Sequence, residues 1–419
     1  MKPILITCIL SFQLVFTFSQ DTLTLQECYQ QAMNTWPAMK EKALLTTANR
    51  LKQQNIKANR YPDIDFNGQA TYQSNVIRID LPIPDISIPE PSKDQYKISV
   101  DINQVLFDGG ITKSQKELEK LNLSADIQQV EIQLYQLKER INNVYFSVLL
   151  LQENEKLLKI MSNEIQERLK IVESGVKNGI IMQSNIDILK AEQLKLEQNT
   201  IELSFNRLAA FEVLKELINN DLPGNIVLQM PPDNFTQSEN ILRPEHTLFD
   251  FQTSRINAHS KLTSNKRNPK LFGFGQFGYG RPAFNYFSDD FDPFYIVGAK
   301  FTWNIWDWNQ NTNERQALSI QKDIIETRKE TFDKNINLAL QKEIASIKKY
   351  EKLIEKDKEI INLRINISKK SASQLENGVI TSTDYLTILN AETQSKINLE
   401  SHKIQLVQAK INYLTINGN

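Results

Sequence analysis

Two short stretches of this chain, Asn59-Arg60-Tyr61-Pro62 and Gly68-Gln69-Ala70-Thr71-Tyr72, occur again as Lys266-Arg267-Asn268-Pro269 and Gly275-Gln276-Phe277-Gly278-Tyr279. Their arginine, proline, glycine, glutamine and tyrosine match at a constant offset of 207 positions. After the next loop the offset becomes 199, and the matches continue in the same order toward the C-terminus. An ordered series of matches at a nearly constant spacing indicates a tandem duplication.

The duplication divides the chain of 419 residues into four parts. Residues 1–19 combine a charged start with an apolar run of about 15 residues, which is typical of a secretory signal peptide and too short for a membrane-spanning anchor. We predict a first copy at 20–222, a linker at 223–240 and a second copy at 241–419. The mature protein is therefore expected to be exported.

The composition argues against several classes of function. Lys and Arg number 49 against 50 Asp and Glu, so the chain lacks the basic excess that nucleic-acid binding requires. Only 13 Gly and 14 Pro argue against a loop-rich enzyme. The three histidines, His246, His259 and His402, lie far apart and show no ligand spacing. We therefore predict a non-enzymatic protein without metal or cofactor.

Each copy contains two segments in which apolar and polar residues alternate, as in a half-buried β-strand. We predict these strands at about 64–80 and 95–107 in the first copy, and at about 271–280 and 294–305 in the second. In a membrane, the apolar face of such strands meets lipid and the polar face lines a wet lumen. Four strands cannot close a barrel, for which about eight are needed, so several chains must combine.

Long helical segments flank the strands. A first helix is predicted at about 24–59 and 243–267, a very long one at about 110–173 and 309–374, and a returning one at about 184–219 and 384–416. The seam of the first long helix steps by four and three residues and then by seven, as in a coiled coil, through Leu137, Ile141, Val144, Val148, Leu151, Leu158, Ile165 and Val172. A helix of this length is a rod of roughly 95 Å.

Aromatic residues concentrate on the second strand pair, where 14 of the chain's 36 fall between 271 and 308. Trp303, Trp306 and Trp308 end this cluster. Amphipathic rings of this kind are typical of membrane–water interfaces, so we predict an interfacial girdle. A soluble aromatic core is the alternative that the sequence leaves open.

The residues Gly273 to Gly278 fit the G-x-G-x-x-G pattern of dinucleotide-binding loops. That pattern binds phosphate only between an apolar strand and a helix N-terminus, whereas Asn268-Pro269-Lys270 precedes it here and an aromatic loop follows. We interpret these glycines as members of a crowded strand instead.

The sequence also resembles the outer-membrane efflux protein family, the TolC-like channels. The resemblance covers nearly all of the predicted mature chain and rests on Leu23–Cys28, Asn34–Pro37, Leu106–Gly110, and the paired turns Gly179 with Leu189–Glu192 and Gly378 with Leu389–Glu392. In this comparison Asp108, Gly109 and Gly110 form the junction between second strand and long helix, and Asp307 matches Asp108.

The resemblance implies a mainly α fold with a small β part. Tandem-duplicated helical hairpins would form a periplasmic α-barrel, and the four transmembrane strands of each chain would contribute to a twelve-stranded outer-membrane β-barrel in a homotrimer. It implies a passive export duct for small molecules or proteins in a tripartite efflux or type I secretion system. The implied partners are a periplasmic adaptor, an inner-membrane transporter and outer-membrane lipid.

Two other readings stay open at this stage. One is a structural coiled-coil protein of the cell envelope without transport activity. The other is a periplasmic adaptor, although an adaptor should carry one helical hairpin inside β-domains rather than a duplicated hairpin after strand pairs.

The resemblance also implies a gate at the periplasmic tip, where acidic residues of symmetric copies form rings. The family's acidic position six residues after the glycine is Asp384 here, whereas its second acidic position is Thr387 and its basic partner is Ile380. The candidate tip residues are therefore Asp384, Thr383 and Gly378, with Asp187 and Gly179 in the first copy. An alternative role for Asp384 is that of a helix N-cap, because Thr383-Asp384 opens the predicted returning helix.

Overall fold

The computed structural model describes residues 22–77, 90–223, 226–233, 235–238, 240–285 and 288–419. The predicted signal peptide and the last residues of the first predicted strand lie outside these ranges. The chain forms two compact units. One contains Pro37–Gln133 and Leu242–Asn337, and the other contains the described residues up to Trp36 together with Leu134–Ile241 and Leu338–Asn419. Each unit therefore draws residues from both predicted copies.

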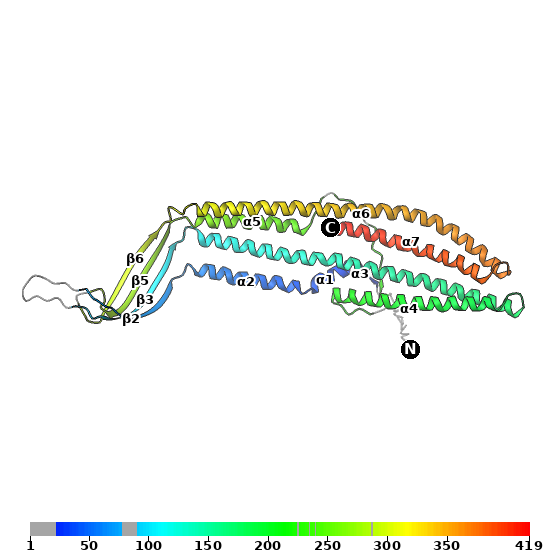
Figure 1. Ribbon diagram of the computed structural model, residues 1–419, viewed down its shortest axis with the longest axis horizontal. Helices are drawn as coiled ribbons and strands as arrows, with labels where there is room; N and C mark the ends of the chain where they lie inside the picture. Colours follow the sequence, from blue (N-terminus) through cyan, green and yellow to red (C-terminus); the bar gives the residue numbers. More distant parts are fainter. Residues whose placement is uncertain (1–21, 78–89, 224–225, 234, 239, 286–287) are drawn as a thin grey trace, which may run out of the picture. The chain divides into compact units, whose positions relative to one another are not determined.

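The unit with Pro37–Gln133 and Leu242–Asn337 contains an antiparallel sheet in the order β2-β3-β5-β6 (Figure 1). Its strands are β2 (Asp63–Tyr72), β3 (Asp94–Phe107), β5 (Lys270–Arg281) and β6 (Asp292–Thr302). Each copy supplies one pair of adjacent strands, and the pairing of β3 with β5 joins the two pairs into one sheet.

The two faces of the sheet differ in polarity, as the alternation predicts. On one face, Asp101 of β3 accepts hydrogen bonds from Asn67 Nδ2 of β2 and Gln276 Nε2 of β5, each at 2.6 Å. On the other face, the rings of Phe277 and Tyr295 stack with centroids 6.4 Å apart across β5 and β6. On each face, these side chains thus contact side chains of similar polarity on the neighbouring strand.

The glycines of the G-x-G-x-x-G pattern lie inside β5. A Cβ placed on Gly278 would lie 2.2 Å from Cζ of Phe294 and 2.6 Å from the backbone oxygen of Ile98. The ring of Phe294 on the neighbouring strand therefore occupies the space that a side chain at position 278 would need. The predicted crowding is confirmed at Gly278, and the pattern does not precede a helix as a phosphate-binding loop must.

Two strand ends differ from the prediction. The first predicted strand, 64–80, ends at Tyr72, and described residues 73–77 are outside the sheet because β3 begins at Asp94, directly opposite Tyr72. The last predicted strand, 294–305, ends at Thr302. Thr302 pairs with Lys270, which is the first residue of β5, so the chain after Thr302 has no partner on that side. Trp303 consequently lies beyond the strand.

The helices follow the duplication closely. The long helices α3 (Ile111–Lys177) and α6 (Gln310–Glu376) each have 67 residues. The first predicted helix of the second copy is α5 (Pro244–Asn265). Its first-copy counterpart, predicted as one helix at 24–59, is instead divided into α1 (Leu25–Thr35) and α2 (Ala38–Ala58). The break falls at Trp36, whose extended backbone precedes a proline, a position from which helical geometry is disfavoured.

None of the helices among the described residues carries an apolar stretch long enough to cross a lipid bilayer.

The second unit contains the returning helices α4 (Ser184–Ile218) and α7 (Ser382–Asn417), helix α1 and the later parts of α3 and α6. Its short parallel pair joins β1 (Thr22–Leu23) to β4 (Val227–Leu228). The hydroxyl of Tyr145 on α3 lies 2.9 Å from the carbonyl oxygen of Leu23 and 2.5 Å from that of Gln229, so it ties this pair to the helix. The predicted coiled-coil seam is confirmed, since five of its members are fully buried: Leu137, Ile141, Val148, Ile165 and Val172.

Candidate functional site: helical tips and strand-to-helix junctions

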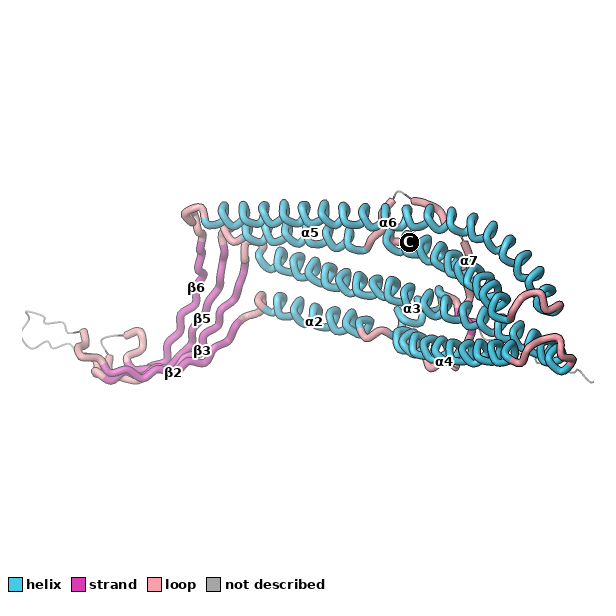
Figure 2. Tube along the Cα trace, turned by 45° about the vertical axis from the view of Figure 1, so that its right-hand side comes forward, coloured by secondary structure: helices cyan, strands magenta, loops and turns pink. Residues whose placement is uncertain are grey.

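Each helical hairpin reverses at a glycine, in the two loops that join α3 to α4 and α6 to α7 (Figure 2). Gly179 and Gly378 have φ angles of +70° and +69°, in the left-handed region that favours glycine. In both turns the residue after the glycine donates its backbone N–H to the carbonyl five positions earlier, at 2.9 Å for Ile180 and 2.8 Å for Val379. These bonds satisfy carbonyls that the helix end leaves open, which explains why both copies keep glycine.

The returning helix of the second copy begins with a capping box. Thr381 is the N-cap of α7, and its hydroxyl accepts the backbone N–H of Asp384 at 3.2 Å. The Asp384 carboxylate in turn accepts the backbone N–H of Thr381 at 3.1 Å and its hydroxyl at 2.6 Å. The predicted N-cap role of Asp384 is therefore wrong in position: Asp384 is the third residue of the helix, and Thr381 precedes it as cap.

Asp384 is nevertheless exposed. Hydrogen bonds from the hydroxyl and backbone of Thr381 lower the pKa of Asp384, so its carboxylate is charged at neutral pH. The neighbouring candidate, Thr383, is exposed as well, and its carbonyl accepts the Thr387 hydroxyl at 2.9 Å. The tip thus presents a fixed anionic group at the start of a helix, where the helix dipole favours negative charge.

The first copy starts its returning helix differently. Asp187 lies in the first turn of α4 and is exposed, but the N-cap Gln183 makes no side-chain capping bond. The carboxylates of the two copies therefore occupy comparable first turns with different local support. Only Asp384 is held by a reciprocal pair of hydrogen bonds.

A buried cluster under the tips joins the two hairpins. Tyr385 is fully buried, and its hydroxyl donates to Glu164 Oε1 at 3.1 Å. Arg168 on α3 pairs with Glu376 on α6 and lies 5.8 Å from the centre of the Tyr385 ring. Burial raises the pKa of Tyr385 to about 12, so the hydroxyl stays protonated and remains a donor.

A backbone contact adds to this connection between the hairpins. The N–H of Ser382 donates to the Asn185 side-chain oxygen at 2.9 Å. Of these cross-hairpin residues the sequence pointed only to Tyr385, which directly follows Asp384 and is expected to help hold the tip closed. The paired residues lie about two hundred positions apart, and no motif marks their pairing.

The strand-to-helix junction of the first copy is a second ordered site. The carboxylate of Asp108 accepts the backbone N–H groups of Gly110 at 2.9 Å and Thr112 at 2.7 Å, which caps α3. Burial alone would raise the pKa of Asp108, but these hydrogen bonds outweigh burial and lower it. Gly109 and Gly110 have φ angles of +69° and +90°, and a Cβ on Gly109 would lie 2.6 Å from Cβ of Asn268.

The junction of the second copy uses the same backbone without glycine. Asp307 accepts the N–H of Asn311 at 3.2 Å, while Trp308 and Asn309 take the two left-handed positions with φ of +51° and +64°. The rings of Trp306 and Trp308 meet edge to face at 5.8 Å, and both indoles are exposed. Trp303 is exposed as well.

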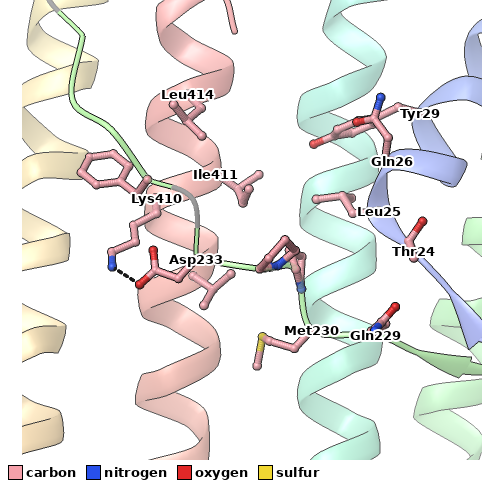
Figure 3. A pocket seen from close by; sticks show the side chains of 14 residues that line it. Thr24, Leu25, Gln26, Tyr29, Gln229, Met230, Asp233, Lys410, Ile411 and Leu414 are labelled. Atoms are coloured by element: carbon pink, nitrogen blue, oxygen red, sulfur yellow. Dashed lines mark hydrogen bonds and ion pairs between the residues drawn. The ribbon is translucent and has the colours of Figure 1, made fainter.

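A cavity of about 260 Å³ lies where α1, the predicted linker and α7 meet (Figure 3). Its lining is mostly apolar and includes Met230 and Ile411. At its edge Lys410 forms an ion pair with Asp233 at 2.7 Å, and the ring of Phe235 packs edge to face on Tyr413. These contacts fix part of the linker to α7.

Within the described ranges no group of three or more His, Cys, Asp or Glu side chains is placed to hold a metal ion. Two of the three histidines pair with single aspartates on α6 instead. His246 Nε2 lies 2.7 Å from Asp333, and His402 Nδ1 lies 2.6 Å from Asp357.

The fold recurs in solved outer-membrane structures along nearly the whole chain. VceC, an outer membrane protein of Vibrio cholerae, is 11% identical, with a TM-score of 0.68 over 94% of this chain and 96% of VceC. The Campylobacter jejuni CmeC outer membrane channel is 14% identical, with a TM-score of 0.67 over 94% and 85%. The Neisseria gonorrhoeae MtrE outer membrane channel, in its open state, is 13% identical, with a TM-score of 0.67 over 94% and 89%. At these identities the similarity establishes the fold.

The duplicated hairpins, glycine tips and capped junctions therefore belong to a chain with the fold of outer-membrane channels. No curated protein matches the sequence. Residues 28–220 match the family described as outer membrane efflux protein. The family match covers most of the first copy, and together with the fold it indicates an outer-membrane protein with an extension into the periplasm.

Proposed function

We propose that several copies of this chain form a passive export duct through the outer membrane. The observation that carries this proposal is the sheet itself, with one apolar face, one polar face, and a partner on only one side of β2 and β6 among the described strands. Open strand edges are not tolerated in lipid, and four strands cannot close a barrel. Three copies would give twelve strands around a wet lumen, continued in the periplasm by the helices as an α-barrel.

The test of this duct is fractionation followed by chemical cross-linking of the full chain. We expect the protein in the outer-membrane fraction and a cross-linking ladder that ends at three copies. A ladder that ends at two copies would favour an eight-stranded barrel over the homotrimer. A soluble periplasmic pool without any outer-membrane signal would defeat the duct.

We further propose that the duct serves a tripartite efflux or type I secretion system through contacts at its tips. Ile180, Met182 and Val379 are large apolar side chains that are exposed at the two turns. Exposed apolar groups gathered at the end of a hairpin are typical of a protein contact site. This contact would be made with the periplasmic adaptor, which connects to the inner-membrane transporter. Photo-cross-linking from position 379 should capture a second protein, and capture of this chain alone would contradict the proposal.

The exposed indoles of Trp303, Trp306 and Trp308 are assigned to the membrane–water interface. They directly follow the sheet, and their rings face solvent in the single chain. Lipid headgroups are the surroundings that suit such half-polar rings.

The gate is proposed at the tips, with Asp384 as its charged group. Symmetric copies would bring their Asp384 carboxylates near one axis, where like charges repel one another and attract cations. The bonds from Thr381 keep each carboxylate ionised, so the ring would retain its charge at neutral pH. The buried contacts of Tyr385 would hold the hairpins together against this repulsion.

The variant Asp384→Asn tests the gate because asparagine keeps a capping oxygen while it removes the charge. We expect normal assembly and weaker block by multivalent cations added on the periplasmic side. Asp187→Asn is the matched control, since it removes one exposed charge from the corresponding helix turn. Unchanged conductance and cation block in Asp384→Asn would leave Asp384 with a capping role only.

A further inference from the structure

The two copies of the duplication contact each other inside one chain. In this contact, β3 of the first copy pairs with β5 of the second. The strand that corresponds to β3 at offset 199 is β6, and the strand that corresponds to β5 at offset 207 is β2. These are the two edge strands of the four-stranded sheet. The open edge of β6 in the second copy is thus equivalent to the edge of β3 through which the first copy binds β5.

We propose that β6 of one chain pairs with β2 of the next in the register that the pairing of β3 with β5 prescribes. In β3 and β5, Asp101 lies opposite Gln276 and Val100 opposite Phe277. The two offsets convert these pairs into Lys300 opposite Gln69, and Ala299 opposite Ala70, of a second copy. The partner is a copy of this chain, and this inference rests on the proposed assembly of several copies.

The polarity of the two edges agrees with this register. Lys300 and Gln69 belong to the polar series of their strands, whereas Ala299 and Ala70 belong to the apolar series. A shift by one residue would place apolar side chains of one strand beside polar side chains of the other. The alternation therefore restricts the register to every second position, and the in-chain pairing selects one of these.

A hydrogen bond inside the chain has its counterpart across the proposed contact. Gln276 Nε2 donates to Asp101 Oδ1 at 2.6 Å between β5 and β3. At the equivalent positions the second copy has Lys300 and the first copy has Gln69. The donor and acceptor roles are exchanged, because the lysine ammonium can donate to the Gln69 carbonyl oxygen.

The helices beside the strands show the same relation through their exposure. Leu121 of α3 and Ala258 of α5 line one crevice between these helices, and Ala258 is only 8% exposed. Their equivalents are Ile320 of α6 and Leu51 of α2, which are 60% and 50% exposed. Equivalent helix positions are thus covered where the other copy of the same chain lies beside them, and exposed on α2 and α6, where the single chain offers no such neighbour.

A second helical position repeats this contrast. Ala125 of α3 is 4% exposed, whereas its equivalent on α6, Ile324, is 46% exposed. Exposed isoleucines and leucines at successive turns of a helix are typical of an unoccupied packing face. The face formed by Ile320 and Ile324 is therefore expected to cover Leu51 of the next chain. Because the two surfaces differ, the contact is heterologous and repeats around a ring.

The register also explains why β6 is shorter than its equivalent. β3 continues to Phe107, and its last residues pair with the first residues of β5. The equivalent residues of the second copy follow Thr302, where the single chain offers no partner. In the proposed contact they lie opposite the start of β2 of the next chain. The strand that ends at Thr302 in one chain is then expected to extend to about residue 306 in the assembly.

Disulfide trapping in the full-length protein tests the register. Lys300→Cys is combined in turn with Gln69→Cys, Asn67→Cys and Thr71→Cys, which lie on the same face of β2. Directly opposed residues have Cα atoms about 5 Å apart, within disulfide reach, whereas diagonal neighbours are about 7–8 Å apart. We expect the pair with Gln69→Cys to give covalent oligomers at least about fivefold more efficiently than the other two pairs, in line with this difference in reach.

The in-chain pair Asp101→Cys with Gln276→Cys is the matched control. It should form a disulfide within one chain and no covalent oligomer, because these residues face each other in the same sheet. Single-cysteine variants control for reaction with the buried Cys28. Preferred trapping of Asn67→Cys or Thr71→Cys would overturn the register while the assembled duct stands. Protein that conducts as an oligomer but is trapped by no pair would overturn the β6–β2 contact, and protein that never oligomerises would defeat the proposed function too.

Discussion

The first strand and helix of the first copy, β2 and α2, and those of the second copy, β5 and α5, hold equivalent places in the duplication but differ in what covers them. β5 has a strand on both sides, whereas β2 has one on a single side. Ala258 of α5 is buried, whereas Leu51 of α2 is exposed. The sequence pattern is the same in both copies, so the difference arises from the neighbour and not from local propensity. Exposed apolar positions in one copy therefore indicate a contact that a single chain lacks.

The largest effect is expected from a charge introduced on α6, at the exposed face formed by Ile320 and Ile324. Ile320→Glu should weaken each contact between copies about 30-fold and so lower the assembled fraction, because burial of an isoleucine side chain contributes about 2 kcal/mol to each contact and a carboxylate cannot be buried there unpaired. Native mass spectrometry or analytical ultracentrifugation in detergent measures this fraction.

Ser319→Glu is the control for that variant, since it adds the same charge at the adjacent exposed position of α6. Its first-copy equivalent, Lys120, lines a crevice toward α2 and not toward α5. Assembly should survive Ser319→Glu. Equal loss in both variants would mean that α6 tolerates no added charge and that Ile320 does not mark the contact.

A smaller and equal effect is expected at the glycines of the two tip turns, where both copies have the same backbone conformation. Gly179→Ala and Gly378→Ala should each lower the free energy of unfolding by about 1 kcal/mol, because alanine is strained at a φ near +70°. Urea unfolding followed by circular dichroism measures both, and Asn178→Ala in the same turn serves as reference. If one glycine tolerates alanine and the other does not, the tips are not equivalent in the assembly.

An effect of similar size at Asp108, and the smallest effect of all at Asp307, is expected at the junctions. Asp108→Ala should cost about 1 kcal/mol as a lost helix cap, and Asp307→Ala should cost less because Asp307 accepts one backbone N–H rather than two. The pKa of Asp108 is lowered in the folded state, so its stabilisation is complete above the unfolded carboxyl pKa of about 3.9 and is lost as pH falls through the lower folded value. Unfolding at pH 7 and pH 3 should therefore differ less in Asp108→Asn than in the original chain. An unchanged difference would assign the acid sensitivity to other groups.

The elements that depend on the local sequence were predicted well. The lengths of α3 and α6, the glycine turns and the alternation along β3 and β5 follow from periodicity and backbone preference. The errors lie where a partner or a neighbour decides the outcome. The end of β6 depends on a strand that one chain does not supply. The N-cap of α7 is Thr381 and not Asp384, because the Thr381 hydroxyl accepts the backbone N–H of Asp384.

The tip cluster shows the same limit for a candidate site. Asp384 is set by its distance from Gly378, which can be read along the sequence. The contact between Tyr385 and Glu164 joins residues from different copies, and the duplication does not relate them to each other. Such a pair becomes visible only when the hairpins are folded side by side.

The central claim, that copies of this chain enclose an open lumen in the outer membrane, is tested most directly by single-channel recording in a planar lipid bilayer. Purified oligomer should give discrete conductance steps that disappear in Ile320→Glu, which assembles poorly, and persist in Ser319→Glu. If the oligomer of the original chain inserts into the bilayer but passes no ions, the claim is contradicted.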